Sequence, residues 1–197
     1  MDKKLLVRIQ RMANSSDWEI KEMAASKIKE INDKYFIDHL PVWKQWICHK
    51  NPNIRRALEV GLLRIPKAHA KEAFSLLLPL LNDDNRYVRK NCGPFALSAV
   101  SYKIPSFAFK EFHILIKDKN QNMRWNIAMC MGAMFGIKYP DKALYILKKV
   151  CRDKRHFVWR AAVSSLIKII RKYPHFEKDV FGWKNCDNCL NTIKKYI

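Results

Sequence analysis

Apolar residues recur along this chain at a spacing that fits α-helices, and the helical pattern itself repeats. In each copy a short polar stretch precedes an apolar anchor residue, and further apolar positions follow it. The five anchors lie 34, 34, 35 and 35 residues apart: Ile20, Ile54, Val88, Met123 and Val158. A fixed period of this length indicates a stacked array of helical repeats, in which neighbouring copies bury each other's apolar faces.

The positions that follow each anchor complete one apolar face. The residues eight positions on are Ile28, Leu62, Ala96, Met131 and Leu166, and those eleven positions on are Ile31, Ile65, Ala99, Met134 and Ile169. These offsets bring the side chains to one side of a helix. We therefore expect the second helix of every repeat to bury this face.

Helix starts and stops agree with the same period. The residues three before the anchors are Asp17, Asn51, Asn85, Asn120 and Arg155, of which four are favourable N-caps. Prolines that open or end helices stand at Pro52, Pro66, Pro105, Pro140 and Pro174. Together these signals predict helices over residues 2–13, 17–32, 36–49, 52–65, 68–82, 86–103, 106–118, 121–138, 141–153 and 156–172.

Paired helices at this period predict an all-α fold, an α-solenoid of about five HEAT-like repeats forming an α-α superhelix. No stretch shows the alternation of apolar and polar residues that is typical of strands. The Trp, Leu-Gly, Tyr and Ala-Phe positions of tetratricopeptide repeats are missing. We expect a single domain over residues 1–197, with repeats starting near residues 1, 36, 68, 106 and 141 and a capping tail over residues 174–197.

The charge of the chain points to a polyanionic partner. Lys and Arg number 38 against 18 Asp and Glu, a formal net charge of +20. Such an excess most often indicates nucleic acid, with an anionic membrane surface or a solvated lysine surface as alternatives. The basic residues are spread over every repeat, which disfavours one membrane-bound amphipathic helix. Because no long apolar segment or secretory leader is recognisable, we expect a cytoplasmic protein.

Cations recur just after the anchors. The first position after each anchor holds Lys21, Arg55, Arg89, Arg124 and Trp159, and the second holds Glu22, Arg56, Lys90, Trp125 and Arg160. Adjacent second helices pack about 8–10 Å apart, so their cations can follow a phosphate backbone on the concave face. The predicted DNA contacts are Lys21, Arg55, Arg89, Lys90, Arg124 and Arg160. For Arg55 and Arg89 an equal alternative is a structural ladder, in which each arginine pairs with an acid of a neighbouring repeat.

One acid stands among these cations. Trp18 and Glu22 are four residues apart and share a helix face, and Glu22 and Arg56 occupy equivalent positions of adjacent repeats. A carboxylate, an indole and a guanidinium are therefore expected to converge in one groove. The alternative for Glu22 and Arg56 is an ordinary exposed ion pair. Arg55 and Glu59 are expected to form a pair along the surface of one helix.

Three stretches carry a resemblance to a known family: Asp17-Trp-Glu-Ile-Lys-Glu-Met-Ala-Ala25, Trp46-Ile-Cys-His-Lys-Asn-Pro-Asn-Ile-Arg-Arg56 and Asp84-Asn-Arg-Tyr-Val-Arg-Lys90. In order and spacing they resemble the HEAT-like DNA glycosylases of the AlkC/AlkD type, over about residues 15 to 173. The resemblance implies excision of N3- and N7-alkylated purines from double-stranded DNA. We expect the protein to be a monomer. It matches Trp18 to the tryptophan that lies against the lesion, Glu22 to the catalytic carboxylate and Arg56 to the arginine beside it.

This chemistry needs little from the protein, since an alkylated purine already carries a positive charge and leaves readily. One carboxylate suffices to stabilise the developing oxocarbenium ion and position a water. The family reaches the glycosidic bond without holding an extruded base in a pocket. The chain departs from the family at Val60, where an acid is expected before Gly61, and at Gly93-Pro94-Phe95. A non-catalytic DNA-binding protein and a protein–protein scaffold therefore stay open as alternatives.

The cysteines do not indicate a cofactor. Six are present, and we expect reduced thiols, with Cys92 and Cys130 on apolar helix faces. Cys186 and Cys189 have the spacing of zinc ligands, but only His175 lies near them and nothing completes a set of four. We expect neither a metal nor a cofactor.

Overall fold

The computed structural model describes residues 3–197, and every regular element in this range is helical. The α-helices are α1 (Lys3–Ala13), α2 (Trp18–Trp46), α3 (Pro52–Gly61), α4 (Ala70–Leu77), α5 (Arg86–Asn91), α6 (Ser98–Lys103), α7 (Pro105–Leu115), α8 (Gln121–Met131), α9 (Met134–Lys138), α10 (Pro140–Val150), α11 (His156–Lys172), α12 (Glu177–Phe181) and α13 (Asp187–Ile193). Short 3-10 turns span Lys67–His69, Leu78–Asn82 and Pro174–Phe176, and a π-helical turn spans Cys92–Leu97. The first predicted helix is described from Lys3 onward, and residues 1–2 lie outside the described part.

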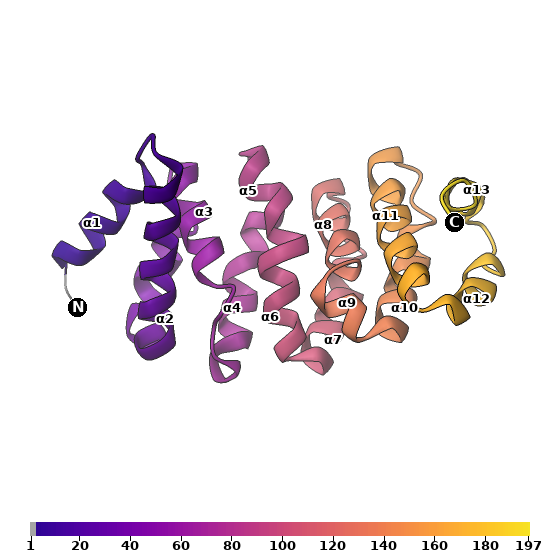
Figure 1. Ribbon diagram of the computed structural model, residues 1–197, viewed down its shortest axis with the longest axis horizontal. Helices are drawn as coiled ribbons and strands as arrows, with labels where there is room; N and C mark the ends of the chain where they lie inside the picture. Colours follow the sequence, from indigo (N-terminus) through magenta and orange to yellow (C-terminus); the bar gives the residue numbers. More distant parts are fainter. Residues whose placement is uncertain (1–2) are drawn as a thin grey trace.

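The helices form one elongated array with the two ends of the chain at opposite ends (Figure 1). The second helices of successive repeats contact one another in the order α2, α3, α5, α8 and α11. The first helices α4, α7 and α10 lie behind this row in Figure 1. The predicted all-α solenoid is confirmed. None of the described helices has the length and apolar character needed to cross a membrane.

Asparagine and aspartate side chains begin the second helices as expected. The Asn85 side chain accepts hydrogen bonds from the backbone N–H groups of Tyr87 and Val88, and Asn120 does the same in the following repeat. Asn51 accepts from Asn53 N–H, and Asp17 accepts from Glu19 N–H. Each cap satisfies donors that the first turn of a helix leaves free. These four caps fix where the side chains of the first turn are presented.

The apolar face predicted from the period is the core. All five residues eight positions after the anchors are fully buried: Ile28, Leu62, Ala96, Met131 and Leu166. Two anchors depart from the expected burial: Met123 is only partly buried, and Ile20 has 37% of its surface exposed. Ile20 is the more exposed of the two. It lies in the first of the second helices, at the end of the row. A helix at the end of a solenoid has a neighbour on one side only.

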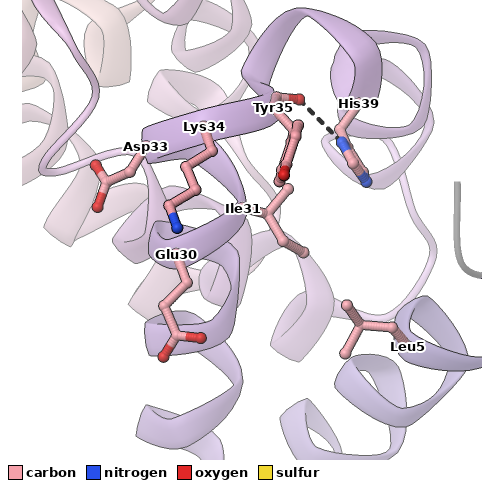
Figure 2. Close-up of a pocket in the computed structure, with 7 residues that line it drawn as sticks. All are labelled: Leu5, Glu30, Ile31, Asp33, Lys34, Tyr35 and His39. Carbon is pink, nitrogen blue, oxygen red and sulfur yellow. Dashed lines mark hydrogen bonds between the residues drawn. The ribbon is translucent and has the colours of Figure 1, made fainter.

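Helix α2 joins two predicted helices through a bend. The backbone of Tyr35 departs from helical geometry at φ −134° and ψ 28°, where the sequence predicts the break between 17–32 and 36–49. The Asn32 side chain donates to the Gly61 carbonyl at 3.0 Å and holds the bend against α3. The bend opens a hollow of about 610 Å³ against Leu5 of α1. Figure 2 shows that Glu30 and Asp33 contribute carboxylates to its lining.

The predicted helix 121–138 is wrong at its centre, because α8 ends at Met131 and α9 begins at Met134. Ala133 is extended, with φ −120° and ψ −158°. Ser98 stabilises the break: its hydroxyl donates to the Cys130 carbonyl and accepts from Phe135 N–H at 2.8 Å. Met134 was expected in the core and is instead 55% exposed, since the break turns it out of the apolar face.

The predicted helix 86–103 is continuous but contains the π turn at Cys92–Leu97. Pro94 lacks the N–H that an α-helix needs at this point. Gly93 N–H donates to the Asn126 side-chain oxygen at 3.0 Å, and the Asn126 amide group donates to the Leu81 carbonyl. The buried Asn126 side chain thus satisfies backbone groups of two elements. The π turn lets the chain pass Pro94 without ending the helix.

Candidate nucleic-acid interface

Trp18, Glu22 and Arg56 lie together, as the repeat register predicts. Arg56 Nη2 donates to Glu22 Oε1 at 3.0 Å, and the Arg56 guanidinium carbon lies 4.4 Å from the centre of the Trp18 ring. The side chain of Glu22 is 40% exposed and that of Arg56 is 19% exposed. Among the described residues, Glu22 Oε2 has no hydrogen-bond partner. The cluster is therefore an open one, with one carboxylate oxygen available to a ligand.

The local sequence explains this placement. Asp17 caps α2, so Trp18 is the first helical residue and projects from the end of the helix with 57% of its surface exposed. Asn51 and Pro52 start α3 in the same register, which places Arg56 in its second turn. Helices α2 and α3 pack side by side. An arginine from one helix therefore covers one face of the indole and reaches the carboxylate of the other.

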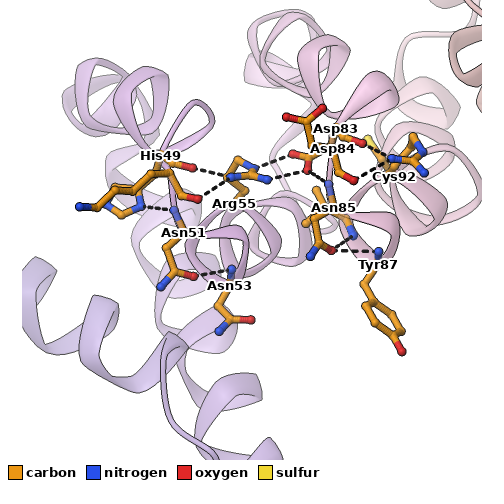
Figure 3. Close-up of polar contacts among 12 residues, drawn as sticks. His49, Asn51, Asn53, Arg55, Asp83, Asp84, Asn85, Tyr87 and Cys92 are labelled. Atoms are coloured by element: carbon orange, nitrogen blue, oxygen red, sulfur yellow. Dashed lines mark hydrogen bonds and ion pairs between the residues drawn. The ribbon is translucent and has the colours of Figure 1, made fainter.

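Arg55, next to Arg56 in the sequence, is held inside the protein. Its Nε and Nη2 donate to the two oxygens of Asp83 at 2.5 and 2.6 Å, and Nη1 donates to the His49 carbonyl (Figure 3). The hydrogen bonds to Asp83 raise the pKa of the Arg55 guanidinium. The Arg55 side chain is 13% exposed and that of Asp83 is 5% exposed. Arg55 therefore pairs with an acid of the neighbouring repeat, which was the structural alternative to a DNA contact.

Two further predicted DNA contacts are also engaged by the protein. Arg89 Nη1 donates to the carbonyls of Asp83 and Asp84, in the loop before its own helix. Arg124 Nε lies 2.9 Å from Asp153 Oδ2 in the next repeat, and Asp153 also pairs with Arg155. Arg89 and Arg124 therefore tie loops to helices along the array.

The remaining predicted cations are more accessible. Lys21 is partly exposed beside Trp18, and Arg160 is exposed on α11. Neither side chain has an ion-pair partner among the described residues. Lys90 Nζ lies 5.9 Å from the centre of the Trp125 ring, and that ring stacks on Phe157 with an interplanar angle of 9°. A second cation–aromatic cluster thus lies farther along the row, on α5, α8 and α11.

A hollow of about 460 Å³ adjoins the Trp18 cluster. Its lining comes from the first two turns and N-caps of three consecutive second helices: Trp18, Lys21, Pro52, Asn53, Arg56, Asn85, Tyr87, Val88 and Asn91. Glu22 does not line it. Trp18, Lys21 and Arg56 are predicted site residues, whereas Tyr87, Asn53 and Asn91 are not. The available signal was position, because Asn53 and Tyr87 both stand one residue before an anchor.

Glu59 corrects another expectation. It does not pair with Arg55 on the helix surface but is buried, with 1% of its surface exposed. The two carboxylate oxygens of Asp83 accept from Nε and Nη2 of Arg55 instead. Glu59 Oε2 has no hydrogen-bond partner in the described structure, and burial raises the pKa of the Glu59 carboxyl well above its ordinary value. Glu59 is the only acid in α3, and its burial leaves that helix without an exposed carboxylate.

The cysteines are buried, apart from Cys48. Cys92 and Cys130 lie in the core as predicted. In the capping tail, Cys189 Sγ lies 2.7 Å from Cys151 Sγ. Within residues 3–197 no group of three or more His, Cys, Asp or Glu side chains is arranged to hold a metal ion.

Comparison with known proteins identifies the fold that carries this cluster. The family described as HEAT repeats matches residues 5–93. AlkD2 from Streptococcus mutans superposes with a TM-score of 0.72 over 99% of this chain and 98% of that chain, at 14% identity. The protein folds as a HEAT-like solenoid. A structure described under TOG–tubulin binding specificity also superposes, with a TM-score of 0.53 over 100% of this chain and 81% of that chain at 15% identity.

Comparison with curated proteins finds no match. At 14–15% identity the structural likenesses establish the fold and no activity.

Proposed function

We propose that the protein binds double-stranded DNA along the row of second helices and excises N3- or N7-alkylated purines by hydrolysis of the N-glycosidic bond. The observation that carries this proposal is the contact of Glu22, Arg56 and Trp18 in one open cluster. The likeness to AlkD2 supports it, because the sequence resembles glycosylases of that type. The net charge of +20 supports a polyanionic partner.

The cluster provides what departure of a cationic base requires. Cleavage of the bond develops positive charge on the sugar, and Glu22 Oε2 is available to stabilise it while Arg56 holds Oε1. The indole of Trp18 is exposed, and its face favours cations. Arg56 holds the carboxylate of Glu22 without burying it, so an attacking water can also reach Oε2. No general acid is required, because the alkylated base leaves as a neutral molecule.

Two departures of the sequence from the family bear on this proposal. Pro94 is accommodated by the π turn, and Phe95 beside it is 58% exposed. An exposed aromatic side chain therefore stands in a stretch where glycosylases of the AlkC/AlkD type carry either a DNA-facing tryptophan or a run of asparagines. The acid missing at Val60 is not replaced by Glu59, which is buried.

A second candidate function is DNA or lesion binding without catalysis, and the ion pair itself favours it. Arg56 neutralises Glu22 at 3.0 Å, and a neutralised carboxylate stabilises a sugar cation less well. In this case the cluster serves to hold DNA and performs no chemistry.

Base release separates the two functions. The protein in excess is incubated with duplex DNA that carries N7- or N3-methylpurine, and the released base is quantified. Wild-type protein is expected to release it, and Glu22→Gln is expected to lower the rate at least about 100-fold while DNA affinity changes less than about twofold. Glu19→Gln, a change of an exposed acid in the first turn of the same helix, is the matched control and should retain the rate.

The outcomes are distinct. If wild-type protein binds duplex DNA but releases no base, it is a binding protein. If Glu22→Gln releases base as fast as wild-type protein, Glu22 is not the catalytic carboxylate.

A further inference from the structure

The hollow beside the Trp18 cluster spans three consecutive helices. Trp18 comes from α2, Arg56 from α3 and Tyr87 from α5, and α3 packs against both of the others. The volume of about 460 Å³ lies within the range of small-molecule binding sites, which is about 300–1,000 Å³. The hollow is therefore large enough for one nucleotide unit.

Tyr87 is the unpartnered aromatic side chain of this hollow. Its surface is 75% exposed, and within residues 3–197 its ring contacts no other aromatic ring or cation. Figure 3 shows the ring extending from the start of α5, away from the hydrogen bonds around Arg55. Its backbone N–H donates to the Asn85 cap, which fixes where the side chain leaves the helix. By contrast, Arg56 already covers one face of Trp18.

The polar lining suits the rest of a nucleotide. Asn53 and Asn91 donate or accept no side-chain hydrogen bond with any other described residue, so both amides are available to a ligand. Side-chain amides recognise the edges of unpaired bases by paired donor and acceptor contacts. Lys21 and Arg56 supply positive charge for a phosphate on the α2 side of the hollow.

The other hollows lack this combination. The hollow at the bend of α2 is lined by charges of both signs, with Glu30 and Asp33 beside Lys34, and has no pair of cations for a phosphate. A hollow between α2 and α4 has an apolar lining that includes Leu40, Ile47 and Leu76.

We propose that the hollow binds one unpaired nucleotide of DNA, with its base stacked on Tyr87, its edge against Asn53 and Asn91, and its phosphate held by Lys21 and Arg56. The inference rests on the proposed binding of DNA and deepens it. Tyr87 is then a selectivity residue, which favours DNA with a locally disrupted base pair over intact duplex. Stacking on an aromatic side chain is independent of base identity, so the preference holds for all four bases.

The test compares two duplexes of the same sequence, one fully paired and one with a single additional unpaired nucleotide in the middle. Their affinities for the wild-type protein are measured by fluorescence anisotropy at fixed salt. We expect tighter binding to the bulged duplex by about five- to 150-fold. Tyr87→Ala should remove this preference and leave affinity for the paired duplex within about twofold, whereas Tyr87→Phe should keep it.

Tyr35→Ala is the matched control, because Tyr35 is 55% exposed and lines the separate hollow at the bend of α2. It should retain the wild-type preference. If wild-type protein binds both duplexes equally, or if Tyr87→Ala weakens both equally, the nucleotide site is overturned while DNA binding stands. If neither duplex binds, the proposed function itself fails.

Discussion

Glu59 is a carboxylic acid enclosed where α3 contacts α5 and the π turn. Burial disfavours its charged form and raises the pKa, the charge of Arg56 lowers it, and the charge of Asp83 raises it. The net shift is upward from the ordinary value of 4.5. The folded protein therefore retains a proton on Glu59 at pH values where the unfolded chain has released it.

Removing this acid should stabilise the protein in a pH-dependent manner. Below pH 4.5 both states carry the proton and Glu59 has no effect on stability. As the pH rises above that value the unfolded state ionises first, so the free energy of unfolding falls until the folded pKa is passed. Glu59→Gln is expected to raise the free energy of unfolding by about 1–3 kcal/mol at pH 8 and hardly at all at pH 4.5. Urea unfolding at both pH values measures this, and an effect independent of pH would show that Glu59 does not titrate.

The neighbouring residues Arg55, Arg56 and Glu59 show which contacts the sequence could predict. Arg56 meets Glu22 because equivalent positions of adjacent repeats lie side by side, and the period alone gives that register. The pairing of Arg55 with Asp83 depends on a loop conformation that no period describes. The i,i+4 spacing of Arg55 and Glu59 permits a surface pair, but two hydrogen bonds to Asp83 hold the arginine elsewhere.

At the scale of single elements, glycines set how closely the second helices approach. A Cβ on Gly93 would lie 2.4 Å from the Asn126 carbonyl oxygen and 2.8 Å from the Asn126 Cα. These are backbone atoms of the next second helix, and they cannot move independently. The close approach also brings the Asn126 side chain to Gly93 N–H, which replaces a hydrogen bond that the π turn releases.

Gly93→Ala should therefore destabilise the protein. The added methyl group separates α8 from the π turn and lengthens the hydrogen bond to Asn126, and overpacking of this kind costs about 1–3 kcal/mol. Gly182→Ala is the control, since its Cβ would meet only ordinary contacts at 3.4 and 3.6 Å and no glycine has a positive φ among the described residues. Thermal or urea unfolding compares the two. Equal stability of both variants would mean that α8 can shift away from α5 without cost.

Helix order and helix faces were predictable, because caps and apolar spacing are local. The breaks within helices were not. The separation of α8 from α9 at Ala133 is held by Ser98 of another repeat, and the π turn at Pro94 is satisfied by Asn126. Both depend on buried polar contacts between elements more than thirty residues apart in sequence.

At the scale of the whole molecule, the basic residues behind the net charge of +20 fall into two groups. Some bind other groups of the protein, and others are accessible to a partner. Three of the six predicted DNA-contacting cations, Arg55, Arg89 and Arg124, bind acids or carbonyls of the protein itself. The charge total predicted a polyanionic partner but could not separate these structural cations from the accessible ones, because both kinds follow the same anchor. The accessible set is Lys21, Lys90 and Arg160, all on the row of second helices.

This division predicts how DNA affinity depends on salt. The plot of log K against log salt has a negative slope. Each phosphate contact that is lost makes this slope less steep by about 0.9, because one fewer counterion is released. Lys90→Ala should make the slope less steep by that amount and weaken binding equally for all sequences. Lys71→Ala is the control: it removes the same charge from α4, a first helix, and Lys71 likewise lies over an aromatic ring, that of Phe107. Titrations at several salt concentrations should leave the Lys71→Ala slope unchanged. If both variants reduce the steepness of the slope equally, DNA does not bind preferentially to the row of second helices. If the wild-type protein shows no salt-dependent DNA binding, a protein–protein scaffold is favoured.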